Sequence, residues 1–250
     1  MFLYTATYFV MQTVLNRSKL CFSRFRKPQG RHISTNGFSQ RQEAVQKLIF
    51  YGIVGGNVAV FACWQLAGED RFRLREMTKH FTVSEYGVRY KHLYHTIVTS
   101  FFSHKTFMHL ALNMFGFITF GYGVLKELGS GRFLVLYYGG GIISSLCHVY
   151  APSLVPRYWP SQRKLENSFG LGASGAISSL IVWNTCRFPS SMVYLFGFVP
   201  IPAVVALLGF GAFDCYNLYS GDVAISSASH LGGAAFGAAF FLLMRRPLRR

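Results

Sequence analysis

The sequence predicts an all-α protein that crosses a membrane with six helices. Only 14% of its 250 residues are charged and 51% are hydrophobic, whereas a soluble domain usually carries about 25% charged residues. The charges gather at a few places and leave six long windows that contain none. A charge at the bilayer centre costs roughly 2.5 to 3.5 kcal/mol, so each window is a candidate membrane span. The sequence lacks the alternating segments of about ten residues that mark a membrane barrel.

The first segment, residues 1–42, holds seven basic residues and no acidic one, and the first acid is Glu43. A start that is rich in Arg, Ser and Thr and free of acids is typical of a mitochondrial transit peptide. A basic tail on the inner side of the membrane is the alternative. We therefore divide the chain into a basic amino-terminal segment, 1–42, and a six-helix domain, 43–250.

The six windows that follow predict the six helices. They cover about 48–68, 106–125, 133–156, 167–186, 188–213 and 223–244. A helix of about 20 residues, at 1.5 Å per residue, crosses a hydrocarbon core of about 30 Å. Six spans put both ends of the chain on one side, where the positive-inside rule also places the basic start and the final arginines. The link 69–105 mixes aromatic and basic residues, and we expect either an element in the membrane interface or a solvated loop.

Net charge and cysteine content limit the kinds of partner and ligand that the chain is expected to bind. The charge of +16 would suit a nucleic acid, but the basic residues lie at both ends and between the windows, where membrane anchors and topology signals belong. We therefore expect the lipid bilayer as a partner and no nucleic acid. The five cysteines form no CxxC pair and no zinc-type spacing, so neither a metal site nor a cofactor is expected.

The second window contains His109 and Asn113, which are four residues apart and therefore share one helical face. Two hydrogen-bonding side chains inside a span either form a polar contact between helices or belong to a functional site. These two residues alone favour neither interpretation.

The fourth window contains Gly172-Ala173-Ser174-Gly175-Ala176. Small residues allow another helix to approach closely, and packing alone would explain them. A serine near the start of a helix could also be a nucleophile, because the free backbone N–H groups there can stabilise an oxyanion.

The sixth window contains His230, followed by Gly233 and Gly237 in a GxxxG pattern. This face can pack closely against another helix, and the fourth window, which is equally rich in small residues, is the expected partner. The contact would bring a nitrogen of His230 within reach of Ser174 Oγ. A buried structural hydrogen bond is the alternative role for a single histidine in a span.

Together these motifs resemble the rhomboid family of intramembrane serine proteases, and the resemblance covers residues 46–244. It implies that Ser174 is the nucleophile, that His230 is the general base, and that His109 and Asn113 assist the backbone N–H of Ser174 in binding the oxyanion. It further implies that Gly172, Ala173, Gly175, Gly233 and Gly237 provide the oxyanion backbone and the close helix packing, and that His104 and Arg132 are structural. Within the first window, the stretch from Asn57 to Trp64 is most similar to the mitochondrial, presenilin-associated branch. That branch often has an additional span before the six helices, and none is expected here.

The family uses a dyad, so no acidic third residue is expected, and neither the fourth nor the sixth window holds Asp or Glu. Some bacterial members place a tyrosine one turn after the nucleophile, stacked on the base. Ser178 stands at that position here. The orientation of His230 must therefore depend on other contacts.

The resemblance implies a serine endopeptidase of the mitochondrial inner membrane that cleaves transmembrane or membrane-adjacent segments of substrate proteins in mitochondrial protein processing. Two alternatives stay open. One is a rhomboid-like protein without proteolytic activity, although intact Ser174 and His230 argue against it. The other is a transporter in which His109 and His230 relay protons, against which we count the absence of a carboxylate from the windows.

Overall fold

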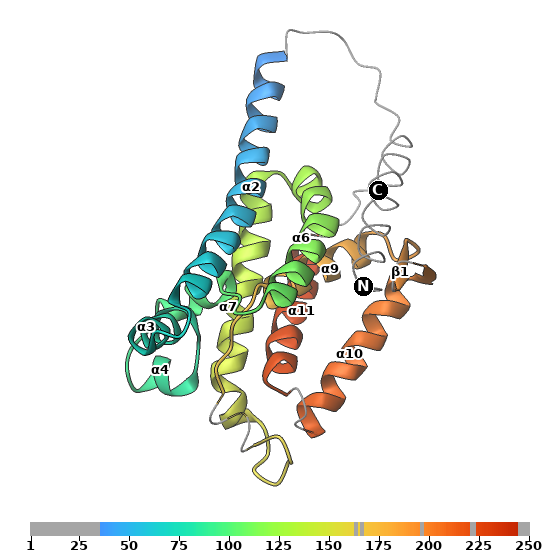
Figure 1. The fold of residues 1–250 in the computed structure, drawn as a ribbon. Coiled ribbons are helices and arrows are strands. Elements are labelled where there is room, and N and C mark those ends of the chain that lie inside the picture. The colour runs from blue at the N-terminus through green and yellow to red at the C-terminus, as the bar shows by residue number, and fades with distance from the viewer. Residues whose placement is uncertain (1–35, 163–164, 166–167, 196–197, 221–223, 245–250) are drawn as a thin grey trace.

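The computed structural model describes residues 36–162, 165, 168–195, 198–220 and 224–244 (Figure 1). Most of the transit segment expected over 1–42 lies outside this range, so its function stays a prediction. Its last residues belong to the first described helix, α2 (Asn36–Ala67), which begins before the expected boundary at residue 43.

Six main helices follow the predicted windows. They are α2, α6 (Phe107–Leu128), α7 (Ser130–Leu154), α9 (Ser174–Arg187), α10 (Ala203–Ser220) and α11 (Ala224–Met244). Among the described residues, five of them are long and apolar enough to cross a membrane, all except α9. The predicted helical membrane fold is confirmed, with one short hairpin added to it. The count of six spans depends on α9, which has 14 residues and rises only about 21 Å.

The link between the first two spans folds into short helices rather than an open loop. They are α3 (Arg71–Phe81), α4 (Glu85–Arg89), α5 (Thr96–Thr99) and the 3-10 turn η1 (Ser100–Phe102). Side chains cap the first two, because Asp70 accepts from the N–H groups that open α3 and Ser84 accepts from one in α4. The link is tied to α2 by a hydrogen bond of 2.8 Å from Trp64 Nε1 to Ser103 Oγ.

The prediction of a helix over the fifth window, 188–213, is wrong at both ends. Residues Met192–Leu195 (β1) and Val199–Pro202 (β2) form an antiparallel hairpin, and helix α10 begins only at Ala203. The reason is Pro200 and Pro202, since proline lacks the N–H that a helix interior needs. At the other end the helix continues through Asp214 to Ser220, beyond the predicted end of the window at residue 213.

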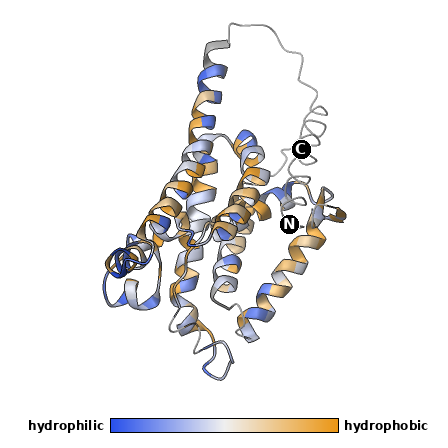
Figure 2. Ribbon diagram, in the orientation of Figure 1, coloured by the Kyte–Doolittle hydropathy of each residue, from blue (hydrophilic) through white to orange (hydrophobic). Residues whose placement is uncertain are grey.

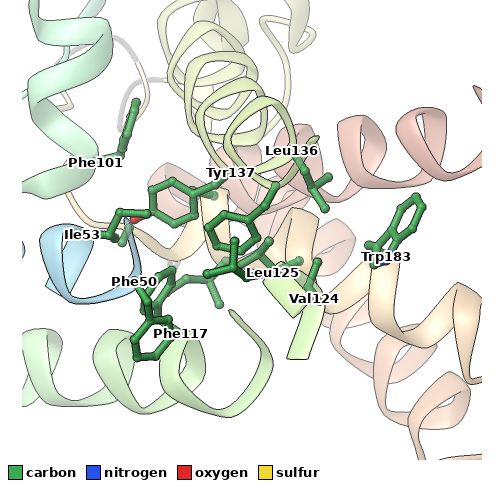
Figure 3. Close-up of a cluster of buried hydrophobic side chains, with 14 of the residues drawn as sticks. Phe50, Ile53, Phe101, Phe117, Val124, Leu125, Leu136, Tyr137 and Trp183 are labelled. Atoms are coloured by element: carbon green, nitrogen blue, oxygen red, sulfur yellow. The ribbon is translucent and has the colours of Figure 1, made fainter. Parts of the chain in front are cut away.

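Aromatic side chains from α2, α6 and α7 form the centre of the core (Figure 3). Phe50 stacks on Phe117 with ring centroids 5.0 Å apart, and Phe117 meets the edge of the buried Tyr137. Interlocking rings leave little freedom for these helices to shift against one another. This packing holds the early turns of α6, with His109, in a fixed place relative to the rest of the bundle.

The start of α2 and the ends of α6, α9 and α11 gather at one end of the bundle. Glu43 lies 4.0 Å from Lys126 and Arg187 lies 2.6 Å from Glu127, and Met244 lines a cavity with the same Glu127. The start of α2 extends beyond its neighbours (Figure 1), and hydrophilic residues gather there (Figure 2). Helix α10 lies at the side of the bundle and packs mainly on α11.

Candidate active site

Helices α9 and α11 cross at a point where glycine brings their backbones together. A Cβ at Gly233 would overlap the carbonyl of Gly175, and one at Gly237 would lie 2.6 Å from the carbonyl oxygen of Ser179. Gly175 itself leaves room for Ser144 of α7. The glycines that the sequence assigned to close packing therefore lie where the two helices meet, and this contact sets the distance between the residues just before them.

Ser174 is the first residue of α9, and four hydrogen bonds fix the loop that leads to it. Gly170 pairs with Val83 as an antiparallel bridge, Gly172 N–H donates to Ser100 O (3.0 Å), and Ala173 N–H donates to His104 Nε2 (3.3 Å). The backbone at Gly172 has φ +117°, a conformation that favours glycine. The loop thus turns sharply and presents Ser174 at a helix start with no side-chain cap.

His104, expected to be structural, lies in the link between η1 and α6 and is fully buried. Burial lowers the pKa of His104 to about 3, with His109 nearby adding to the effect. The ring is therefore neutral, and its Nε2 can accept the N–H of Ala173. His104 holds the loop immediately before the candidate nucleophile.

Ser174 and His230 meet across the helix crossing, with Ser174 Oγ 2.9 Å from His230 Nε2. Both residues are half-buried. This is the separation of a hydrogen bond through which a base can take the proton of a hydroxyl. The spacing of small residues in the two windows was the signal that predicted this contact.

We expected no acidic residue beside Ser174 and His230, but the structure places one in contact with His230. Asp214 of α10 places Oδ1 3.3 Å from His230 Nδ1, on the side of the ring away from Ser174. A window defined by the absence of charge ends directly before Asp214 and therefore excludes this carboxylate. A stretch that stays apolar on both sides of Asp214 was the signal that could have found it. The finding also removes the lack of a carboxylate in the spans as a reason to reject a transporter.

His109 and Asn113 lie on the face of α6 that borders Ser174. A Cβ on Gly172 would be 2.7 Å from two ring atoms of His109, and Asn113 Nδ2 donates to the carbonyl of His109 at 2.9 Å. The amide of Asn113 is therefore engaged by its own helix in this structure. The part of these two side chains in binding an oxyanion stays a prediction.

A cavity of about 390 Å³ opens beside Ser174 and His230. His109, Asn113 and Gly172 line it, together with five serines outside the predicted site: Ser100, Ser144, Ser145, Ser226 and Ser229. Hydroxyl groups at helical spacing in apolar windows were the signal for them. Such a lining can hydrogen-bond water. In the described part of the chain no three His, Cys, Asp or Glu side chains are grouped to hold a metal ion.

The model of the rhomboid domain matches residues 91–247, more than half of the chain and all of the site. The chain belongs to the rhomboid family. It is 30% identical to RHOMBOID-like protein 12, mitochondrial, of Arabidopsis thaliana over 79% of this chain and 59% of that protein. It is 31% identical to Presenilin-associated rhomboid-like protein A, mitochondrial, of Danio rerio over 81% of this chain and 48% of that one.

A third relative is Rhomboid protein 1, mitochondrial, of Saccharomyces cerevisiae, which is 32% identical over 76% of this chain and 51% of its own length. The rhomboid chain thus spans about half the length of the curated relatives it matches. With relatives named as mitochondrial and with its apolar helices, it is a multi-pass mitochondrial membrane protein. The resemblance of the sequence to the mitochondrial branch is confirmed.

Proposed function

We propose that this rhomboid chain is an intramembrane serine endopeptidase that hydrolyses a peptide bond in or beside a transmembrane segment of its substrates. The observation that carries the proposal is the contact of 2.9 Å between Ser174 Oγ and His230 Nε2, at a helix start and beside a cavity. His230 takes the proton of Ser174 as the oxygen attacks the substrate carbonyl, and it returns the proton to the leaving amine. Water then cleaves the acyl-enzyme.

The start of α9 supplies the electrostatic part of this mechanism. The first N–H groups of a helix have no partner within the helix, and the helix dipole favours negative charge there. In α9 these groups belong to Ser174, Gly175 and Ala176, whereas Ile177 N–H already donates to Ala173 O. An oxyanion that forms on the carbonyl attacked by Ser174 develops beside these donors. Each oxyanion donor typically contributes about 100- to 1000-fold to the rate.

Water reaches the site because α9 is short. Its rise of about 21 Å is less than a hydrocarbon core of about 30 Å, and its other end carries Arg187, paired with Glu127 at the end of the bundle. With that end at one membrane surface, Ser174 lies beneath the opposite surface, under the link of short helices. The cavity lined by serines then connects the site to that side.

The substrate that suits this site is a transmembrane segment that unwinds locally. A helical peptide carbonyl is bonded to an N–H four residues on and is shielded by side chains, so the cleaved bond must first become extended. Glycine or proline near that bond weakens the helix. Relatives named as mitochondrial support a role in protein processing at the mitochondrial inner membrane.

The proposal is tested by labelling the purified protein in detergent with a fluorescent serine-reactive phosphonate. We expect wild type to be labelled and Ser174→Ala and His230→Ala to remain unlabelled, because the probe needs a hydroxyl activated by the base. Ser178→Ala is the matched control. Ser178 lies one turn further along α9 and donates only to the carbonyl of Ser174, so its removal should leave labelling unchanged.

The same experiment separates the alternatives. If wild type stays unlabelled under conditions in which an active rhomboid protease reacts, the chain is a proteolytically silent member of the family. If the chain is a proton-relay transporter, phosphonate labelling should not depend on Ser174. Equal labelling of Ser174→Ala and wild type would therefore be compatible with the transporter.

A further inference from the structure

An imidazole ring has two neutral tautomers, and only one of them leaves Nε2 free to accept the proton of Ser174. On the opposite edge of the His230 ring, Nδ1 lies 3.3 Å from the carboxylate oxygen Oδ1 of Asp214. An ionised carboxylate only accepts hydrogen bonds. In this contact Nδ1 therefore carries the hydrogen, and Nε2 presents its lone pair to Ser174 at 2.9 Å.

We propose that Asp214 is a positioning residue for the general base, so that the working unit is Ser174, His230 and Asp214 on three different helices rather than a pair. The inference rests on the proposed function and deepens it. Asp214 fixes the tautomer and direction of the ring, and its charge stabilises the imidazolium that forms when His230 takes the proton.

The position of Asp214 supports a specific role. A carboxylate within a membrane span is costly and is usually paired, and the side chain of Asp214 is only 16% exposed. In the part of the chain that the structure describes, His230 is the basic group that meets it. Packing of α10 on α11 would be served better by an apolar residue, so stabilising the bundle does not explain the charge.

Nothing else among the described residues performs this function for His230. Ser178, one turn after Ser174, has no ring to stack on the imidazole, and no aromatic ring packs on His230 in the described part of the chain. The other titratable groups that face it are His109 of α6, across the cavity, and Cys147 of α7, beneath Gly232. Neither is an anion that would offset the charge of an imidazolium.

The test compares the rate of phosphonate labelling for wild type, Asp214→Asn and Asp214→Glu as a function of pH. Asn has nearly the same shape but no charge, and its amide can present either a donor or an acceptor to Nδ1. We expect Asp214→Asn to lower the plateau rate at high pH by about 10- to 1000-fold. We also expect the acidic limb of its profile to move to lower pH. Asp214→Glu restores the charge and should recover part of the plateau.

Glu127→Gln is the matched control, because it removes an ion-paired carboxylate from the far end of the bundle. It should leave both the plateau and the acidic limb unchanged. Size-exclusion profiles and thermal unfolding establish that each variant is folded. If Asp214→Asn does not fold, the profile of Asp214→Glu decides, since a displaced carboxylate should still lower the plateau.

The outcomes are distinct. If the pH profile of Asp214→Asn has the same acidic limb and the same plateau as wild type, the role of Asp214 is overturned, while labelling of wild type still supports the protease. If the acidic limb moves but the plateau rate does not fall, Asp214 is only a nearby charge, and the proposal that it positions His230 is overturned. A wild type that is not labelled at all overturns the proposed function itself.

Discussion

At the scale of single residues, the loop before α9 depends on one unusual backbone conformation, at Gly172, and on one charge state, that of neutral His104. Gly172 adopts φ +117° against the ring of His109, and His104 accepts a backbone N–H only while its ring is neutral. Both keep the backbone around Ser174 in one arrangement. Protonation of His104 would turn its acceptor nitrogen into a donor that faces another donor.

His104 therefore makes stability depend on pH. Its pKa is lowered from 6.5 to about 3 by burial, so the unfolded chain binds a proton below about pH 6.5 while the folded chain does not. Stability is unaffected above that pH and falls as the pH drops, by up to about 1.4 kcal/mol per pH unit and about 2 kcal/mol by pH 5. Thermal unfolding in detergent should show a steeper loss for wild type than for His104→Gln, whose amide oxygen can accept the same N–H.

The other histidines are present in both proteins, so the difference between the two curves isolates His104. Parallel loss of stability in wild type and His104→Gln would mean that position 104 is accessible to protons in the folded state, contrary to its burial.

At the scale of elements, the crossing of α9 and α11 sets the geometry of the site. The two helices approach closely only because Gly233 and Gly237 lack side chains where they meet the backbone of α9. One turn before this contact, His230 reaches Ser174. Separation of the helices by the width of a methyl group would therefore lengthen the contact between His230 and Ser174.

Gly233→Ala introduces a Cβ that overlaps the carbonyl of Gly175, so one helix must move. We expect a loss of about 1 to 3 kcal/mol in stability and a loss of phosphonate labelling larger than the fraction unfolded explains. Gly211→Ala on α10 is the matched control, because nothing lies within 4 Å of its Cβ position. It should be neutral or slightly stabilising. Equal behaviour of the two variants in thermal unfolding would contradict tight packing at Gly233.

The elements also show what could be predicted from sequence. Charge-free windows located α6, α7 and α11 well, because a bilayer excludes charges. The predicted bounds of the fifth span are wrong at both ends, and the reasons lie in single residues. Prolines at 200 and 202 place a hairpin in its first part, and the charge of Asp214 predicts a boundary where the helix continues, because the partner of Asp214, His230, lies sixteen residues further along the chain. Small-residue patterns predicted that Ser174 and His230 approach. A partner on a third helix has no comparable pattern.

At the scale of the whole molecule, the start of α2 and the end of α11 lie at the same end of the bundle, and the link of short helices lies at the other. In the sequence, the basic segment 1–42 leads into α2 and the final arginines follow α11, so the positive-inside rule assigns the former end to the matrix side of a mitochondrial inner membrane. The site would then open toward the intermembrane space.

This orientation predicts which positions an impermeant maleimide reaches in mitochondria stripped of their outer membrane. In a chain whose native cysteines are replaced by serine, Glu69→Cys should be labelled at once. Arg41→Cys, at the start of α2, and Arg187→Cys, at the end of α9, should react only after the inner membrane is permeabilised. All three positions are exposed on the protein itself. If position 41 is labelled before permeabilisation and position 187 is not, the two positions do not share a side of the membrane. If only positions 41 and 187 are labelled before permeabilisation, the orientation is inverted.

The short length of α9 links the site to the lipid around it. Because this helix is about 9 Å shorter than an average hydrocarbon core, the depth of Ser174 is set by how thick the bilayer is, not by the protein alone. A thinner membrane brings the serine toward the headgroups, and a thicker one sinks it further from water at a modest energetic cost of mismatch. The proposed hydrolysis would therefore run at different rates in membranes of different acyl length, and lipid composition would regulate it without any ligand.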